Sequence, residues 1–103
     1  MKLVAESPSI IVADDDEEFT RELCEFLTDH GYRPAIASSM TELAAMLAAS
    51  PPSIVLLDQF MHGRDAVLAI PDIRTSYSGG LIVLTGNVEP SGKSRIARKW
   101  FSN

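Results

Sequence analysis

Three aspartates in this sequence stand where strands would end. Asp14 and Asp15 follow the apolar run of residues 10–13, and Asp58 follows that of residues 54–57. Short continuous apolar runs are typical of strands buried on both faces of a parallel sheet, and ligand sites in such sheets lie beyond the carboxyl ends of the strands. If the two strands are neighbours, we expect the three carboxylates to converge at that edge.

Crowded carboxylates repel one another, so a cluster of three predicts a bound hard cation. Mg²⁺ suits such a cluster best because it takes oxygen ligands, keeps several waters and is commonly held by one or two carboxylates together with a phosphoryl oxygen. Thr85 ends another apolar run, residues 81–84, and would bring a hydroxyl able to hydrogen-bond a phosphoryl oxygen. The residues therefore indicate a Mg²⁺ site that can also hold a phosphoryl group.

Simpler roles compete with this one. Asp16 is the expected N-cap of a following helix, and Glu17 and Glu18 would complement the dipole of that helix. Asp14 and Asp15 could likewise serve only to start that helix, and Asp58 could be a simple turn residue. Thr85 could be present only because threonine favours strands. The convergence of acids from two strand ends favours the metal site.

The segments that must position these side chains alternate between helix and strand patterns. Residues 17–30 carry apolar side chains at helical spacing, and Gly31 is a typical helix stop. Residues 32–37 are a weaker strand candidate, placed at a sheet edge because Pro34 donates no hydrogen bond. Residues 39–49 begin with a Ser-x-x-Glu capping box and predict a second helix.

Two further strands and a third helix follow. Residues 53–58 and 81–85 predict buried strands, and residues 65–74 predict a helix that Pro71 must kink or split. Near the end of the chain, residues 96–101 suit either a short strand or the start of a helix. The alternation predicts an α/β fold, a doubly wound parallel sheet with right-handed crossovers.

Composition limits the remaining classes. With 103 residues, the chain has room for one domain, expected at residues 9–103 after an N-terminal tail at residues 1–8. The formal charge of −5 argues against direct nucleic-acid binding, because phosphate backbones attract basic surfaces. No apolar run suggests a membrane segment or export signal, so we expect a cytoplasmic protein. Cys24, the single cysteine, is expected to be a small buried side chain.

The order and spacing of these motifs resemble the response-regulator receiver family of two-component signalling. The resemblance covers residues 9–86 and includes Ile-Ile-Val-Ala-Asp-Asp-Asp at residues 10–16, an Ile-Val-Leu-Leu-Asp that ends 43 residues after Asp15, and Ile-Val-Leu-Thr-Gly at residues 82–86. It implies a flavodoxin-like fold with strand order 2-1-3-4-5.

The same resemblance implies roles for the acids. Asp58 would be the phosphoacceptor, and Mg²⁺ would be held by Asp14, Asp15, Asp58 and the backbone carbonyl of Phe60. The phosphoryl group would come from a histidine kinase or a histidine phosphotransfer protein, and the phosphorylated domain would act on a downstream signalling protein. His62 would be a loop residue beside the site rather than a ligand.

The C-terminal part departs from the family pattern. Thr85 matches the switch hydroxyl and Gly86 the small residue that gives a phosphodonor access. Lys99 is the best match to the phosphate-facing lysine, but it stands only 14 residues after Thr85 and Trp100 replaces the usual proline. Lys93, or no cation at all, is the alternative. The chain therefore resembles an atypical receiver with a shortened C-terminal part.

That shortening predicts that the family's helices 4 and 5 are absent or altered. Loss of the last helix would expose an apolar face of the sheet, and exposed apolar patches seek partners. We expect a homodimer, or exchange of a strand or helix, through residues 86–103; the alternative is that the chain is part of a longer protein.

The leading hypothesis is thus a phosphorylatable receiver that is not an enzyme beyond its own phosphotransfer and slow autodephosphorylation. One alternative is a pseudo-receiver, which would use the same fold only to bind proteins. The other is a small Mg²⁺-dependent phosphohydrolase, against which stands the lack of a second acid two residues after Asp58.

Overall fold

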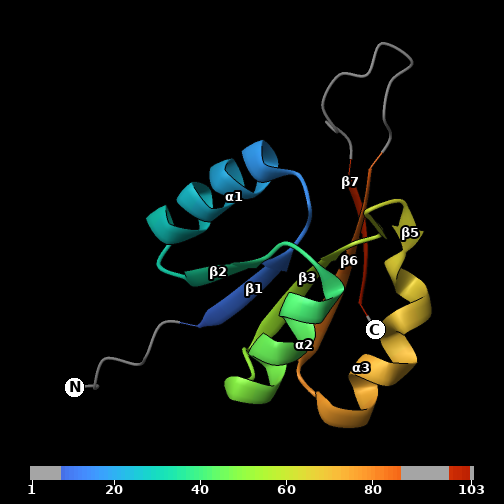
Figure 1. Cartoon of the computed structure of the whole chain (residues 1–103). Helices are drawn as coiled ribbons and strands as arrows, with labels where there is room; N and C mark the ends of the chain where they lie inside the picture. The colour runs from blue at the N-terminus through green and yellow to red at the C-terminus, as the bar shows by residue number, and fades with distance from the viewer. Residues whose placement is uncertain (1–7, 87–97, 103) are drawn as a thin grey trace.

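The computed structural model describes residues 8–86 and 98–102 as a sheet with helices packed on it (Figure 1). The strands are β1 (Ser9–Ala13), β2 (Arg33–Ala37), β3 (Ile54–Asp58), β6 (Gly80–Gly86) and β7 (Arg98–Ser102), and a separate small hairpin is made of β4 (Phe60–Met61) and β5 (Arg64–Asp65). The helices are α1 (Glu17–Asp29), α2 (Met40–Ala49) and α3 (Ile70–Ser76), the last preceded by the 3-10 turn η1 (Ala66–Ala69).

The strand order in the large sheet is β2-β1-β3-β6-β7, and β1, β2, β3 and β6 run parallel. The predicted doubly wound sheet and its strand order are therefore confirmed, as is the edge position of the proline-containing β2. Residues 98–102 form a strand, which settles the choice left open for the end of the chain.

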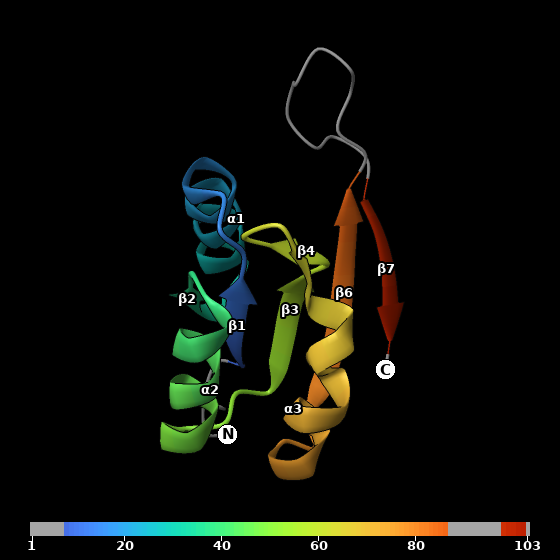
Figure 2. The same cartoon turned by 45° about the vertical axis from the view of Figure 1, so that its right-hand side comes forward.

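The predicted parallel sheet has one exception, its last strand. β7 pairs antiparallel with β6, and in Figure 2 the two arrows point in opposite directions. A parallel connection needs a crossover of about a dozen or more residues, usually with a helix, to return the chain to its starting edge. Only eleven residues of sequence, 87–97, separate β6 from β7, which is short for a parallel connection.

The alternating side chains of β1, β3 and β6 supply two separate apolar clusters. Those of Ile11, Val55 and Leu81 belong to a large cluster completed by α2 and α3, which lie side by side in Figure 2. Those of Ile10 and Val12 belong to a smaller cluster with α1 on the opposite face. This alternation is what a sheet covered on both faces requires.

Local capping fixes where the first two helices begin. The side chain of Asp16 accepts a hydrogen bond from the Phe19 N–H at 3.0 Å, and that of Ser39 accepts one from the Glu42 N–H at 3.0 Å. Gly31, with φ of +90°, ends α1 in the left-handed conformation that glycine adopts most easily. The predicted caps and the predicted stop are thus confirmed.

The third helix is split as its proline predicts. Pro71 lies in the first turn of α3, where its missing N–H costs nothing, and η1 precedes it. The β4–β5 hairpin was not predicted. Its two-residue loop is His62-Gly63, with φ of +52° and +77°, which are the left-handed values of a type I′ turn.

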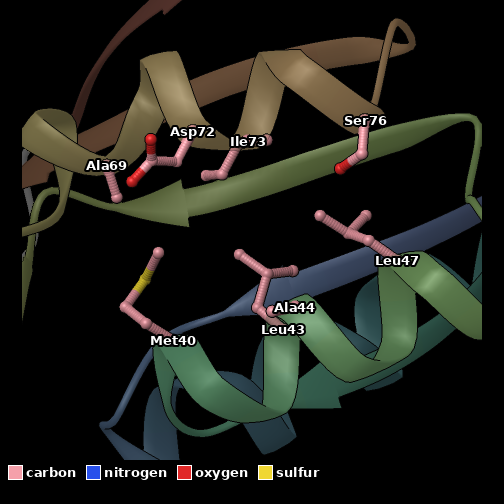
Figure 3. Close-up of a pocket in the computed structure, with 8 residues that line it drawn as sticks. All are labelled: Met40, Leu43, Ala44, Leu47, Ala69, Asp72, Ile73 and Ser76. Atoms are coloured by element: carbon pink, nitrogen blue, oxygen red, sulfur yellow. The ribbon is translucent and has the colours of Figure 1, made fainter.

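A cavity of about 230 Å³ lies between α2 and α3. In Figure 3 the side chains of Met40, Leu43 and Leu47 on α2 point across it toward Ala69 and Ile73, so its lining is mostly apolar. The two helices therefore cover their face of the sheet without filling all the space between them.

Several predictions fall outside the described residues. These are residues 1–7 of the predicted N-terminal tail, the predicted loss or alteration of helix 4, the alternative cation Lys93, and most of the segment expected to form a dimer. Within the described ranges, no helix is both long and apolar enough to cross a membrane.

Candidate functional site

The three aspartates do converge at the carboxyl end of the sheet. β1 and β3 are neighbours, with Ala13 level with Leu57, so Asp14 and Asp58 leave the sheet side by side. One carboxylate oxygen from each of Asp14, Asp15 and Asp58 lies within 4.8 Å of the others. Figure 2 shows the arrowheads of β1, β3 and β6 at this same end of the molecule.

Asp14 is held rigidly at the base of the site. Only 1% of it is exposed, its N–H donates to the Ala37 carbonyl at 3.1 Å, and its Oδ1 accepts a hydrogen bond from the Asp16 N–H at 3.0 Å. The first bond extends the pairing of β1 with β2 by one residue, and the second ties the carboxylate to the start of α1. Asp14 and Asp16 thus have different roles: Asp16 caps the helix, and Asp14 belongs to the acid cluster.

Asp15 is the more accessible acid, with 27% of its side chain exposed. Its Oδ2 accepts a hydrogen bond from the backbone N–H of His62 at 2.7 Å, and Nδ1 of the His62 ring lies 3.8 Å from the same oxygen. A carboxylate has two oxygens and several lone pairs, so this contact leaves acceptor capacity on Asp15.

The third acid, Asp58, is 3% exposed at the end of β3 and is level with Leu84 of β6. The next residue, Gln59, donates its N–H to the Leu84 carbonyl at 2.9 Å, which carries the strand pairing to the rim of the site. Thr85 follows Leu84 directly and is half-buried. The register therefore brings the predicted threonine to the same rim as the buried acid.

The remaining predicted residues lie around this rim. Lys99 is directly opposite Thr85 in the register of β6 and β7, and Gly86 is opposite Arg98. Phe60 begins β4, pairs with Asp65 and is 55% exposed. The backbone thus brings all these positions to one end of the sheet.

The donor set fits Mg²⁺. Three carboxylates offer hard anionic oxygens, and like charges packed this closely repel one another. A divalent cation would balance that charge. Asp14, Asp15 and Asp58 are the residues that would hold it.

Sequence reasoning placed His62 in a loop beside the site but missed its contacts. The ring Nε2 is 2.9 Å from the Ser38 carbonyl oxygen, while the backbone N–H holds Asp15. The signal available in the sequence was the two-residue His62-Gly63 link between short segments, a weak hairpin pattern without the favoured Asn-Gly. The contact joins residues 47 positions apart, which no local pattern reveals.

Comparison with known proteins shows which class this fold and site define. Residues 10–99 match the family described as "Response regulator receiver domain", and this chain belongs to that family. It is a receiver domain of the kind found in two-component response regulators.

Particular relatives agree with this assignment. The chain is 30% identical over 86 residues to the photosynthetic apparatus regulatory protein RegA of Rhodovulum sulfidophilum, covering 81% of this chain and 46% of that protein. It is also 30% identical to the N-terminal domain of a response regulator receiver protein from Methanoculleus marisnigri JR1, with a TM-score of 0.72 over 82% of this chain and 72% of that one. The chain spans less than half the length of the first curated relatives it matches.

A third comparison concerns the fold alone. The BeF3-activated N-terminal receiver domain of Klebsiella pneumoniae RstA is 23% identical, with a TM-score of 0.71 over 81% of this chain and 71% of that one. The flavodoxin-like arrangement implied by the sequence motifs is therefore the fold of this protein. Receiver domains typically act in signalling rather than as enzymes, and the homologues include transcriptional regulatory proteins.

Proposed function

We propose that residues 9–103 form a phosphorylatable receiver in which Asp58 takes a phosphoryl group from a phosphohistidine. The donor would be a histidine kinase or a histidine phosphotransfer protein. The observation that carries the proposal is the cluster of Asp14, Asp15 and Asp58, whose oxygens lie within 4.8 Å although two of the three residues are buried. A fold alone does not need such a cluster, because buried acids cost stability.

The chemistry follows from the position of Asp58. Its carboxylate oxygen attacks the phosphohistidine phosphorus, the new O–P bond forms as the P–N bond breaks, and the histidine leaves with the electrons of that bond. The product is an aspartyl phosphate. Mg²⁺, when bound, would neutralise charge on the transferred phosphoryl group. Asp14 and Asp15 would serve as its ligands, together with Asp58 and the backbone carbonyl of Phe60.

Switching is assigned to the β6–β7 side of the rim. The Thr85 hydroxyl would hydrogen-bond the new phosphoryl oxygens, and Lys99, opposite it in the register, would supply a positive charge. Gly86 would leave the phosphodonor a path to Asp58. Movement of β6 toward the phosphoryl group would then alter the surface offered to a downstream signalling protein.

A pseudo-receiver is the second candidate, because the position of Lys99 departs from the family pattern. It would bind partners through the same fold without chemistry at Asp58. The acid cluster favours the phosphorylatable form over it. A phosphohydrolase would need a second acid two residues after Asp58, where Phe60 stands.

The decisive experiment measures phosphorylation directly. With Mg²⁺ and acetyl phosphate, the protein should gain about 80 Da, the mass of one phosphoryl group, by intact mass spectrometry. Asp58→Asn should abolish the adduct. Asp16→Asn is the matched control: it removes a neighbouring charge, yet asparagine caps helices as well as aspartate does, so the adduct should remain. An adduct that persists in Asp58→Asn would refute the assignment, and absence of any adduct in the unchanged protein would favour the pseudo-receiver.

A further inference from the structure

His62 occupies an unusual backbone conformation next to the acid cluster. It is the one residue other than glycine with positive φ in the described part of the chain, at +52°. Asparagine and glycine are the residues that favour this conformation in the first position of a type I′ turn, because they pay the smallest steric penalty. Histidine tolerates positive φ better than most residues, but turn chemistry alone would favour asparagine, aspartate or glycine here.

The contacts of His62 supply a reason. Its backbone N–H donates to Oδ2 of Asp15 at 2.7 Å, and its ring Nε2 lies 2.9 Å from the Ser38 carbonyl oxygen. A carbonyl oxygen only accepts, so Nε2 carries the proton and donates. One residue thus connects the β4–β5 turn to the loop after β1, which bears Asp15, and to the loop after β2, which bears Ser38.

Together these two bonds restrain Asp15, one of the acids of the cluster. The bond from the ring to Ser38 fixes the turn, and the turn presents its N–H to one oxygen of Asp15. The carboxylate is thereby restrained in rotation, with its other oxygen left for a cation. Metal-ligating carboxylates are commonly oriented by such outer hydrogen bonds, and loss of one costs about 10- to 100-fold in metal affinity.

We propose that His62 is a positioning residue for the cation site, acting through its ring bond to Ser38 and its backbone bond to Asp15. This inference rests on the proposed function, since it takes the acid cluster to bind Mg²⁺. The ring contributes little to the core, because 62% of the His62 side chain is exposed. Its removal should therefore change the site more than the stability of the fold.

Two substitutions separate positioning from turn stability. His62→Asn suits the left-handed turn better than histidine but is too short to reach Ser38, while His62→Gln suits the turn less well but keeps an amide donor at the reach of Nε2. Mg²⁺ dissociation constants would be measured by isothermal titration calorimetry. Free energies of unfolding would be measured in urea with EDTA present, so that bound metal does not contribute.

The two variants should rank in opposite order for Mg²⁺ affinity and for the free energy of unfolding. His62→Asn should weaken Mg²⁺ binding by about tenfold, with an unfolding free energy equal to or above that of the unchanged protein. His62→Gln should bind Mg²⁺ within about threefold of the unchanged protein although its fold is no more stable, because it keeps the donor. Equal affinity in all three proteins would overturn the inference, as would losses of affinity that simply follow losses of stability.

The same titration distinguishes failure of the inference from failure of the proposed function. If the unchanged protein binds Mg²⁺ and Asp58→Asn does not, the acid site stands, and the His62 variants then decide the role of the turn. If the unchanged protein does not bind Mg²⁺ at millimolar concentrations, the metal site itself is wrong and the positioning role is refuted with it.

Discussion

The face of the sheet under α2 and α3 and the face under α1 differ in how they are covered. Among the described residues, the cluster on the α2–α3 face contains fourteen buried residues, whereas the cluster on the α1 face contains Ile10, Val12 and Leu27. The strands, in contrast, present similar apolar side chains to both faces. In β3, for example, Val55 and Leu57 face one side and Ile54 and Leu56 the other.

The difference shows that coverage, not strand composition, decides where the protein is firmly packed. Ile54 and Leu56 remain half-buried under α1, and Ile82 and Leu84 of β6 are half-buried too, whereas Val55 is fully buried. Most of the free energy of folding should therefore come from the α2–α3 face. The α1 face should therefore be the less costly one to alter.

Truncation of one leucine on each face gives the largest expected contrast. Leu43→Ala should lower the free energy of unfolding by about 3–5 kcal/mol, because Leu43 is 1% exposed and borders the cavity between α2 and α3, which the change would enlarge. Leu27→Ala should cost about 2–3 kcal/mol, since Leu27 belongs to the smaller cluster. Urea denaturation with a common slope would test this. Equal losses for the two variants would break the comparison.

A polar contact at the base of the α2–α3 face gives a smaller effect. The hydroxyl of Tyr77, a residue only 3% exposed, lies 3.0 Å from the Pro52 carbonyl oxygen in a buried position and 3.0 Å from that of Gly80. Tyr77→Phe should lower the free energy of unfolding by about 1–2 kcal/mol, because a buried carbonyl loses its donor. Pro52 lies just before β3 and Gly80 is the first residue of β6, so the loss would be felt where these strands begin.

The same tyrosine predicts a pH dependence. Burial raises the pKa of the Tyr77 hydroxyl above its ordinary value of 10.0, with the Arg74 guanidinium lowering it by a smaller amount. A raised pKa means that the folded protein holds the proton more tightly, so this contribution to stability is complete below pH 10 and is lost as the pH rises through the folded pKa. Unfolding measured from pH 9 to 11 should show this decline in the unchanged protein and a weaker one in Tyr77→Phe.

The sequence predicts a structural feature best where that feature depends on residues close together in the chain. Asp16, Ser39 and Pro71 each set a helix boundary within four residues of themselves, and all three were predicted correctly. The convergence of the acids was predictable because strand alternation and parallel pairing together bring the ends of β1 and β3 to one edge. Local rules combined with one topological rule were enough for that much.

The rest depends on interactions that no short segment encodes. The direction of β7 follows from how the chain returns to β6, and an apolar run has the same pattern in either direction. The contact of His62 with Asp15 depends on a turn that places two distant loops together. Cys24 was expected to be buried but is only partly buried. The apolar stripe of its helix was predicted correctly, but the sequence does not reveal how few buried residues the α1 face of the sheet contains.

Cys24 offers the smallest of these effects and a direct test of how open the α1 face is. Its thiol packs beside the smaller cluster, and burial raises its pKa above the ordinary value. Because the thiolate is the reactive form, iodoacetamide should modify Cys24 more slowly than free cysteine at pH 8, by less than about tenfold, with the rate rising as the pH increases. A thiol placed by Ala66→Cys in a Cys24→Ser background is the matched probe of the α2–α3 face, where Ala66 is 4% exposed. That thiol should react more slowly than Cys24; if it reacts as fast, the two faces open equally and their unequal coverage has no consequence for the dynamics of the domain.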